Sequence, residues 1–168
     1  KFGRHFKFYK FRSMYIDAEA RKAELMGQNE SRDGVIFKMK HDPRITPVGR
    51  FIRKFSIDEL PQLFNVLLGD MSLVGPRPER KSIAEEYEKE IPEFSYRLKV
   101  KAGLTGYAQV YGQYNTEPLD KLKLDLTYIE HYSVWLDIKL MVLTIKILFA
   151  KEKSEGVDNK QTTALKEK

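Results

Sequence analysis

Apolar and polar residues alternate along the chain with either the two-residue period of a strand or the longer period of a helix. The two-residue period predicts only a few strands. Aromatic residues alternate with cations between residues 5 and 14, which predicts a strand with rings on one face and basic side chains on the other. A second short strand is expected at 35–39. Glycine and tyrosine recur over 101–115, which predicts a turn followed by a strand.

Helical periodicity dominates the rest of the chain. Thr46 and Pro47 make a favourable helix start, because a hydroxyl can cap the first turn and a proline suits the first helical position. Leucine and phenylalanine recur at helical spacing from Leu60 to Leu68, just before Gly69, and predict a second helix. Further helices are expected over 17–28, 80–90, 119–132 and 134–150.

These elements predict an α+β fold, a mainly helical single domain with a few short strands. At 168 residues the chain is long enough to bury a core without disulfide bonds. It contains no cysteine, which excludes a disulfide framework and thiolate catalysis. We expect the domain to occupy residues 1–150 and the polar segment 151–168 to form a disordered tail.

Cations gather in the first third of the chain. Residues 1–56 hold 14 Lys and Arg against 6 Asp and Glu, a balance of +8, whereas the remaining residues carry −2. A basic front favours a polyanionic partner, such as a nucleic acid, an anionic lipid or a phosphorylated substrate. A basic surface that only aids solubility is the alternative.

The last predicted helix is strongly apolar. No run in the sequence reaches the roughly 18–20 uninterrupted apolar residues that span a bilayer. Segment 134–150 comes nearest, but it includes Asp137, Lys139 and Lys146. The two lysines are seven residues apart and therefore share a helix face. The pattern is typical of a helix that lies in a membrane interface or docks on a core, and we favour docking.

The acidic pair Asp58-Glu59 is the strongest candidate for chemistry. A structural interpretation is available, since Ser56 and Glu59 have the spacing of a helix capping box. With Ser56 as the N-cap, however, Pro61 would disrupt the first intrahelical hydrogen bond. With Asp58 as the N-cap, Pro61 takes a position where no bond is lost, and both carboxylates lie at the helix mouth beside free N–H groups.

Cations are expected around this pair. Arg50, Arg53 and Lys54 share one face of the preceding helix. A carboxylate among such charges should be ionised, and it is therefore available as a nucleophile or as a Mg²⁺ ligand.

Other cations are candidates for phosphate contacts. Arg77 stands between Pro76 and Pro78, and this stiff loop would position its guanidinium to bind phosphate at a low entropic cost. A surface loop residue is the alternative. Lys10 and Arg12, on the predicted first strand, form either a phosphate contact or a solvated face.

Five long motifs follow one another along the chain. They are Lys-Phe-Arg-Ser-Met at 10–14, Asp-Glu-Leu-Pro-Gln at 58–62, Gly-Asp-Met-Ser-Leu-Val-Gly-Pro-Arg-Pro-Glu at 69–79, Lys-Ala-Gly-Leu-Thr-Gly-Tyr-Ala-Gln-Val at 101–110 and Asp-Leu-Thr-Tyr-Ile-Glu at 125–130. In this order they resemble the bacterial sugar transferases, the monotopic polyprenyl-phosphate phosphoglycosyl transferases. The resemblance extends over nearly the whole chain.

The resemblance implies a reaction and its partners. Members of this family transfer a sugar-1-phosphate from a UDP-sugar to a polyprenyl phosphate such as undecaprenyl phosphate, and UMP leaves. The reaction is the first membrane step in the assembly of exopolysaccharide, capsule, lipopolysaccharide or another glycoconjugate. The expected location is the cytoplasmic face of the bacterial cell membrane, with amphipathic helices at the membrane interface and a homo-oligomer as one alternative for the assembly.

The matching motifs also imply residue roles. Asp58 would attack the β-phosphorus and hold the phosphosugar as an aspartyl phosphate ester, which the lipid phosphate then displaces. Glu59 would ligate Mg²⁺, the implied cofactor, which neutralises the diphosphate and assists the departure of UMP. The implied substrate-binding residues are Arg53 and Arg77, with Lys10 and Arg12 behind them, and Asp125 on the metal or uridine side.

The chain departs from the family pattern at two places. The family normally has a hydrophobic, membrane-dipping helix before the motif at 10–14, and its absence here makes us expect an N-terminally truncated catalytic core. Gln113 stands where many relatives have arginine, which puts one phosphate contact in doubt.

Two other functions remain as alternatives. A nucleic-acid-binding module would use Phe6, Phe8 and Phe11 as a stacking platform with the cations between them, and it would not need Asp58. A non-catalytic scaffold on the membrane surface would use the helix at 134–150. The ordered motifs favour the transferase and argue against a nucleic-acid partner.

Overall fold

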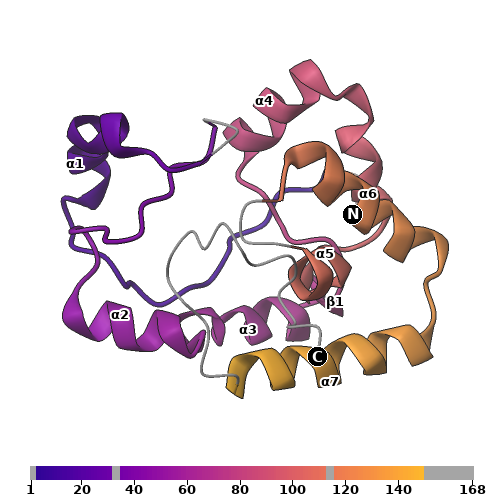
Figure 1. Cartoon of the computed structure of the whole chain (residues 1–168). Coiled ribbons are helices and arrows are strands. Elements are labelled where there is room, and N and C mark those ends of the chain that lie inside the picture. Colours follow the sequence, from indigo (N-terminus) through magenta and orange to yellow (C-terminus); the bar gives the residue numbers. More distant parts are fainter. Residues whose placement is uncertain (1–2, 32–34, 113–115, 150–168) are drawn as a thin grey trace, which may run out of the picture.

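The computed structural model describes residues 3–31, 35–112 and 116–149, and it shows a mostly helical molecule with a small parallel sheet (Figure 1), which confirms the α+β class. The helices are α1 (Ala18–Leu25), α2 (Pro47–Lys54), α3 (Gln62–Leu67), α4 (Lys81–Glu90), α5 (Tyr107–Tyr111), α6 (Pro118–Glu130) and α7 (Val134–Phe149). The 3₁₀ segments are η1 (Met26–Gln28), η2 (Ile57–Glu59) and η3 (Pro92–Lys99). The strands are β1 (Ser72–Val74) and β2 (Gly103–Thr105).

Parallel pairing of the two strands fixes the loop that follows β1. The register pairs Ser72 with Gly103 and Val74 with Thr105. Beyond the strand, the Gly75 N–H donates to the Thr105 carbonyl at 2.9 Å. The Gly103 N–H donates to the Pro76 carbonyl, also at 2.9 Å. The two segments approach so closely that a Cβ atom on Gly103 would lie 2.1 Å from the Gly75 nitrogen.

Two apolar clusters form the core, and α6 contributes to both. One cluster joins β1, α5, α6 and α7, and its buried residues are Val74, Val110, Tyr128 and Leu140. The other joins α4, η3 and α6, and its buried residues are Tyr87, Phe94 and Leu122. Because α6 lies in both clusters, it connects the sheet to the α4–η3 pair.

Helix α7 docks on the core with one face and leaves another face exposed. Asp137 accepts a hydrogen bond from the Tyr128 hydroxyl at 2.8 Å, and Thr144 pairs with Thr105 at 2.6 Å. The preference for a docked helix is therefore right. Its outer face still carries exposed apolar side chains, at Trp135, Ile138, Val142 and Ile145. Within the described residues, no helix has both the length and the apolar composition that crossing a bilayer requires.

Helix α3 is oriented with polar side chains inward. Gln62 and Asn65 are buried, and Asn65 is 0% exposed. The apolar stripe predicted from the sequence faces outward, and Leu67 is 82% exposed. The other exposed members are Leu60, Leu63, Phe64 and Leu68. Helices α2, α3 and α7 lie along the same side of the molecule (Figure 1), so apolar side chains gather there.

The predicted strand at 5–14, called the arm from here on, is wrong. The arm forms no ladder with a strand in the described part of the chain, and only an isolated antiparallel bridge joins its Met14 to Ile45. Its main-chain groups instead bond to the Asn65 side chain and the Asp58 main chain. Alternating side chains fit any extended segment, whichever groups supply its hydrogen bonds, so the pattern alone could not distinguish the two cases.

The other strand predictions have mixed outcomes. The strand at 35–39 is wrong, because Lys38 pairs with a loop: its carbonyl accepts from the Glu30 N–H at 2.8 Å and its N–H donates to Asn29 Oδ1 at 2.9 Å. The strand expected within 101–115 is confirmed as β2, but helix α5 follows it. Gln113 and the predicted tail at 151–168 lie outside the described residues.

The helix predictions are confirmed as α1 with η1, α2, α3, α4, α6 and α7. Thr46 caps α2 as expected, since its Oγ1 accepts the Gly49 N–H at 2.8 Å. The first turn of α2 packs against the arm, because the Thr46 N–H donates to the Ser13 carbonyl at 3.1 Å. A Cβ atom on Gly49 would lie 1.9 Å from that same oxygen. Glycine is therefore required where α2 meets the arm.

We expect Gly49→Ala to destabilise the protein, although alanine favours helices. In an unobstructed helix the change would stabilise by about 1 kcal/mol, whereas the clash with the Ser13 main chain should give a net loss of about 1–3 kcal/mol. Urea unfolding measures the difference. Val48→Ala, at the exposed neighbouring position, is the control and should change the unfolding free energy by less than about 0.5 kcal/mol. A stabilised Gly49→Ala variant would contradict the packing of α2 on the arm.

Candidate active site

The acidic pair lies in η2, a single 3₁₀ turn between α2 and α3. The chain enters this turn through Ser56, whose φ of 53° lies in the left-handed region and costs a non-glycine residue about 1–2 kcal/mol. The prediction that Asp58 caps the next helix is wrong, because α3 begins only after Pro61. A proline lacks an N–H group and starts a new helix readily, which separates the acids from α3. Ser56 makes no side-chain capping bond, so the capping box is not formed either.

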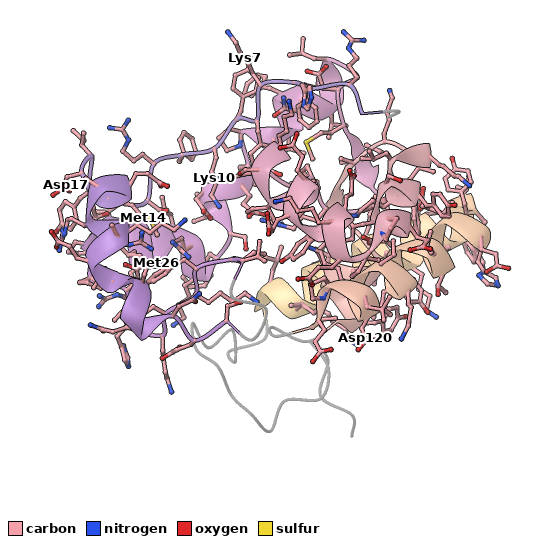
Figure 2. All side chains as sticks on the ribbon, turned by 90° about the horizontal axis from the view of Figure 1, so that it is seen from above. Lys7, Lys10, Met14, Asp17, Met26 and Asp120 are labelled. Carbon is pink, nitrogen blue, oxygen red and sulfur yellow. The ribbon has the colours of Figure 1, made fainter. Side chains whose placement is uncertain are left out.

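Asp58 is almost completely buried, with 2% of its surface exposed, and its carboxylate contacts a cation. Lys10 Nζ lies 2.9 Å from Asp58 Oδ2 and 3.4 Å from Glu59 Oε1. Lys10 comes from the arm, whose Phe11 N–H donates to the Asp58 carbonyl at 2.9 Å. Figure 2 shows Lys10 near the middle of the molecule. Main-chain and side-chain contacts therefore both join the arm to the acidic turn.

Glu59 pairs with a second cation, Arg77. The guanidinium contacts both carboxylate oxygens, with Nη1 donating to Oε2 at 3.2 Å and Nη2 donating to Oε1. Burial alone would raise the pKa of Glu59, but the hydrogen bond and charge of Arg77, together with Lys10, outweigh burial and lower the pKa to about 2. Glu59 is therefore ionised throughout the physiological pH range.

The main chain of Arg77 is held in place by a hydrogen bond from a buried side chain. Its carbonyl accepts a hydrogen bond from Arg97 Nη2 at 2.9 Å. Arg97 belongs to η3, is itself buried, and contacts Asp125 Oδ2 through Nε at 3.0 Å and Nη2 at 2.7 Å. Glu79 lies 3.7 Å from Arg97 Nη1 and also pairs with Lys121 of α6. The loop that carries Arg77 is thus fixed to α6 by charged pairs.

Asp125 lies behind this loop. It is 1% exposed, and its contact with the rest of the site runs through Arg97. Burial raises the pKa of Asp125, although the charges of Arg97 and Lys121 act in the opposite direction. Asp125 therefore supports the Arg77 loop indirectly, through Arg97. Its predicted contact with the metal or uridine stays a prediction.

The remaining predicted cations stand apart from the acids. Within the described residues, neither Arg12 nor Arg53 forms a hydrogen bond or ion pair with the acidic pair. Arg12 is exposed on the arm, and the charge of Arg53 acts on Asp42. Lys10, expected behind Arg53, contacts both acids directly, as Arg77 contacts Glu59. Substrate binding by Arg12 and Arg53 stays a prediction.

Arg97 and Asn65 are site residues that were not predicted from the sequence. Asn65 is fully buried in α3 and its amide bonds to the arm. A signal was present in this case, because Asn65 interrupts the apolar run from Leu60 to Leu68, and a buried amide needs partners. Arg97 gives no comparable signal, since arginine is seldom buried and its partners lie far away in the sequence.

The chemistry of the acidic pair is compatible with a Mg²⁺ ion held partly by substrate, and Mg²⁺ binding stays a prediction. Among the residues that the structure describes, no group of three or more His, Cys, Asp and Glu side chains could hold a metal ion. Magnesium commonly binds through one or two carboxylates plus substrate phosphates, however. Asp58 and Glu59 supply two adjacent carboxylates, and an oxygen that accepts one hydrogen bond from Arg77 keeps a second lone pair.

The family profile described as bacterial sugar transferase matches residues 1–151. This chain belongs to the bacterial sugar transferase family. The match contains the arm, the acidic turn, the Arg77 loop and their supports Arg97 and Asp125. The resemblance that the ordered motifs carry is thus confirmed.

Relatives of this family member come from several bacteria. It is 51% identical over 147 residues to the galactosyl transferase CpsE of Streptococcus agalactiae serotype III (strain NEM316), covering 87% of this chain and 32% of that protein. It is 42% identical over 151 residues to the UDP-N-acetylgalactosamine-undecaprenyl-phosphate N-acetylgalactosaminephosphotransferase of Aeromonas hydrophila, covering 88% and 33%. It is 42% identical over 148 residues to the UDP-glucose:undecaprenyl-phosphate glucose-1-phosphate transferase of Escherichia coli (strain K12), covering 85% and 29%. The chain spans about a third of the length of these relatives.

We expect Glu59→Gln to lower the unfolding free energy at pH 7. With a pKa of about 2 against an ordinary 4.5, ionised Glu59 stabilises the fold above pH 4.5, and this contribution is lost as the pH falls through about 2. Because the Arg77 side chain is 36% exposed, solvent screening should limit the contribution to roughly 1–2 kcal/mol. Urea unfolding of both proteins from pH 7 downward should show the gap narrowing below pH 4.5. A gap that does not change with pH would rule out Glu59 as its source.

Proposed function

We propose that this chain is the catalytic part of an enzyme that transfers a sugar-1-phosphate from a UDP-sugar to a polyprenyl phosphate and releases UMP. The observation that carries the proposal is the buried carboxylate of Asp58, in contact with Lys10 and next to the Glu59–Arg77 pair. A buried acid among fixed cations suits covalent catalysis on a substrate that carries two phosphates. The names of the Aeromonas and Escherichia relatives, which include undecaprenyl phosphate and UDP-sugars, support this choice of substrates.

The reaction proceeds in two displacements at one phosphorus atom. First, an oxygen of Asp58 attacks the β-phosphorus of the UDP-sugar, the bond from that phosphorus to UMP breaks, and UMP leaves with the electron pair. An aspartyl phosphate ester of the sugar remains. Then an oxygen of the polyprenyl phosphate attacks the same phosphorus and the bond to Asp58 breaks. The product is a polyprenyl-diphosphate-sugar, and Asp58 returns to its carboxylate form.

Lys10 and Arg77 have different parts in this sequence. Lys10 pairs with the attacking carboxylate, and a bound diphosphate offers its ammonium a second anion, which frees one oxygen of Asp58 for attack. Arg77 keeps Glu59 ionised and oriented. Mg²⁺ held by Glu59 would neutralise part of the diphosphate charge. Each step therefore uses a cation that the fold already places beside an acid.

We also propose that the protein binds the cytoplasmic face of the bacterial cell membrane through the side formed by α2, α3 and α7. These helices lie on one side of the molecule (Figure 1), and they and the residue that follows α2 carry exposed apolar side chains: Val48, Phe51, Phe55, Phe64, Leu67, Leu68, Trp135, Ile138 and Val142. Exposed cations accompany them and suit anionic headgroups: Arg50, Lys54, Lys139 and Lys146. A lipid-linked acceptor would approach from the same phase.

We expect Asp58→Asn to lower the rate of UMP release by more than about 1,000-fold, because an amide cannot replace the attacking carboxylate. The assay uses the full-length protein in lipid with a panel of UDP-sugars, which also identifies the sugar. Asp120→Asn is the matched control, since this acid is exposed on α6 (Figure 2) and should leave the rate unchanged. Without acceptor, mass spectrometry should find a sugar phosphate on the peptide that contains Asp58. UMP release by Asp58→Asn at the parent rate would refute the nucleophile.

We expect the double variant Leu67→Glu, Trp135→Glu to bind anionic vesicles at least about tenfold more weakly in a sedimentation assay, because two exposed apolar anchors become charged. Ile16→Glu is the control, since Ile16 is 88% exposed and belongs to none of the helices α2, α3 and α7. Equal binding by all three proteins would contradict the membrane surface. Lipid-free dimers that the same double variant disrupts would assign this side to a second copy of the chain instead.

A further inference from the structure

Asn65 is a buried polar residue whose side chain bonds to the arm and not to its own helix. Its Oδ1 accepts the Tyr9 N–H at 3.1 Å, and its Nδ2 donates to the Lys7 carbonyl at 2.6 Å. Both ends of the amide are therefore hydrogen-bonded, as burial of an amide requires. The arm in turn owes two of its main-chain hydrogen bonds to this one side chain.

These bonds follow the geometry of a β-ladder. In an extended chain the main-chain groups of every second residue point to the same side. Lys7, Tyr9 and Phe11 alternate in this way, and the Phe11 N–H continues the row by donating to the Asp58 carbonyl at 2.9 Å. The Asn65 amide and the Asp58 main chain together therefore take the place of a neighbouring strand.

The register of the arm decides which side chain reaches the acidic turn. Neighbouring side chains of an extended segment point to opposite faces, and a slip by one residue exchanges the faces. In the register observed, Lys7 lies at the outer edge of the molecule and Lys10 near its middle (Figure 2). Lys10 Nζ then meets Asp58 Oδ2 at 2.9 Å. A slip would bring an aromatic residue to this place.

The main chain of Asn65 is tied to the opposite side of the site. Its carbonyl accepts the N–H groups of Asp70 at 2.9 Å and Met71 at 3.1 Å, in the turn that Gly69 makes with a φ of 80°. This turn leads into β1 and on to the loop that carries Arg77. The main chain of Asn65 is thus held by the segment that leads to Arg77, while its side-chain amide holds the arm.

We propose that Asn65 is a positioning residue of the transferase. Its amide holds the arm in the register that places Lys10 on Asp58, and it does so without touching substrate. The kinetic consequence rests on the proposed function, whereas the placement of Lys10 is measurable without catalysis.

Lysine acylation measures this placement directly in the full-length protein. The protein is treated with a limiting amount of an amine-acylating reagent, and peptide mass spectrometry gives the ratio of label on Lys10 to label on Lys7. In the parent, Lys10 should react more slowly than Lys7, because two carboxylates contact the Lys10 nitrogen, whereas Lys7 forms no ion pair with a described residue. In Asn65→Ala the ratio should rise toward one.

A second pair of variants leaves α3 unchanged. Tyr9→Pro removes the N–H that bonds to Asn65, whereas Phe8→Pro removes an N–H from the opposite side of the arm. Both replaced residues are aromatics of similar exposure, 42% for Phe8 and 41% for Tyr9, and Phe8→Pro additionally removes a ring contact with Phe6. Tyr9→Pro should raise the Lys10 to Lys7 ratio as Asn65→Ala does, and Phe8→Pro should leave the ratio at the parent value.

A double-mutant cycle on UMP release separates positioning from general support of the fold. Asn65→Ala alone should lower kcat by about 10- to 100-fold, since displacement of a positioned group by about 1 Å has effects of this size. In a Lys10→Met background the same change should have little further effect, because the residue it positions is gone. A structural role would lower kcat by the same factor in both backgrounds.

The outcomes divide clearly. A label ratio that stays at the parent value in both Asn65→Ala and Tyr9→Pro overturns the proposal, and so do independent effects on kcat in the cycle. A ratio that rises in both variants while no variant, parent included, releases UMP supports the positioning role and refutes the proposed function. If Asn65→Ala does not fold, the Tyr9→Pro and Phe8→Pro comparison decides alone.

Discussion

Two adjacent carboxylates, largely withdrawn from water, are the constraint on which the rest of this structure depends. Charges in such a place are costly unless cations meet them. The cations come from distant parts of the chain: Lys10 lies 49 residues before Glu59, and Arg77 lies 18 residues after it. Neither cation belongs to a regular element, so each needs separate support. The parallel strand pair and Arg97 hold the Arg77 loop, while Asn65 and the Asp58 main chain hold the arm.

Helix α3 shows how this constraint shapes the outside of the molecule. Its six residues are too few to form a stable helix alone, so contacts with its surroundings must stabilise it. Its inward face carries the buried amides of Gln62 and Asn65, of which Asn65 bonds to the arm, and the leucine and phenylalanine side chains face out. Folding in water would ordinarily place these side chains in a core. Helix α3 therefore supplies polar contacts to the arm on its inner face and an apolar surface on its outer face.

Local signals in the sequence predicted local structure well. The Thr46-Pro47 start of α2, the periodic run of α3 and the long helices α6 and α7 follow from capping and spacing alone. The acidic pair was found, but its turn was not, because a left-handed Ser56 has no sequence signal. The arm looked like a strand since rings and cations alternate along it, although the alternation changes phase at Tyr9 and each face carries both kinds. Only the folded structure shows that a side-chain amide replaces the partner strand. The contact of Lys10 with Asp58 depends on that long-range register.

The outward face of α3 also affects what stability means for this protein. Exposed apolar side chains such as Leu67 come to lie on the same side of the molecule as α7 only when the chain is folded, since α3 and α7 share that side. Any apolar phase that covers this surface binds the folded state in preference to the unfolded chain, and by mass action it shifts the folding equilibrium. Folding and attachment to that phase are then thermodynamically coupled. The free energy of unfolding measured in plain buffer is a lower bound, and the melting temperature becomes a property of the protein together with its surroundings.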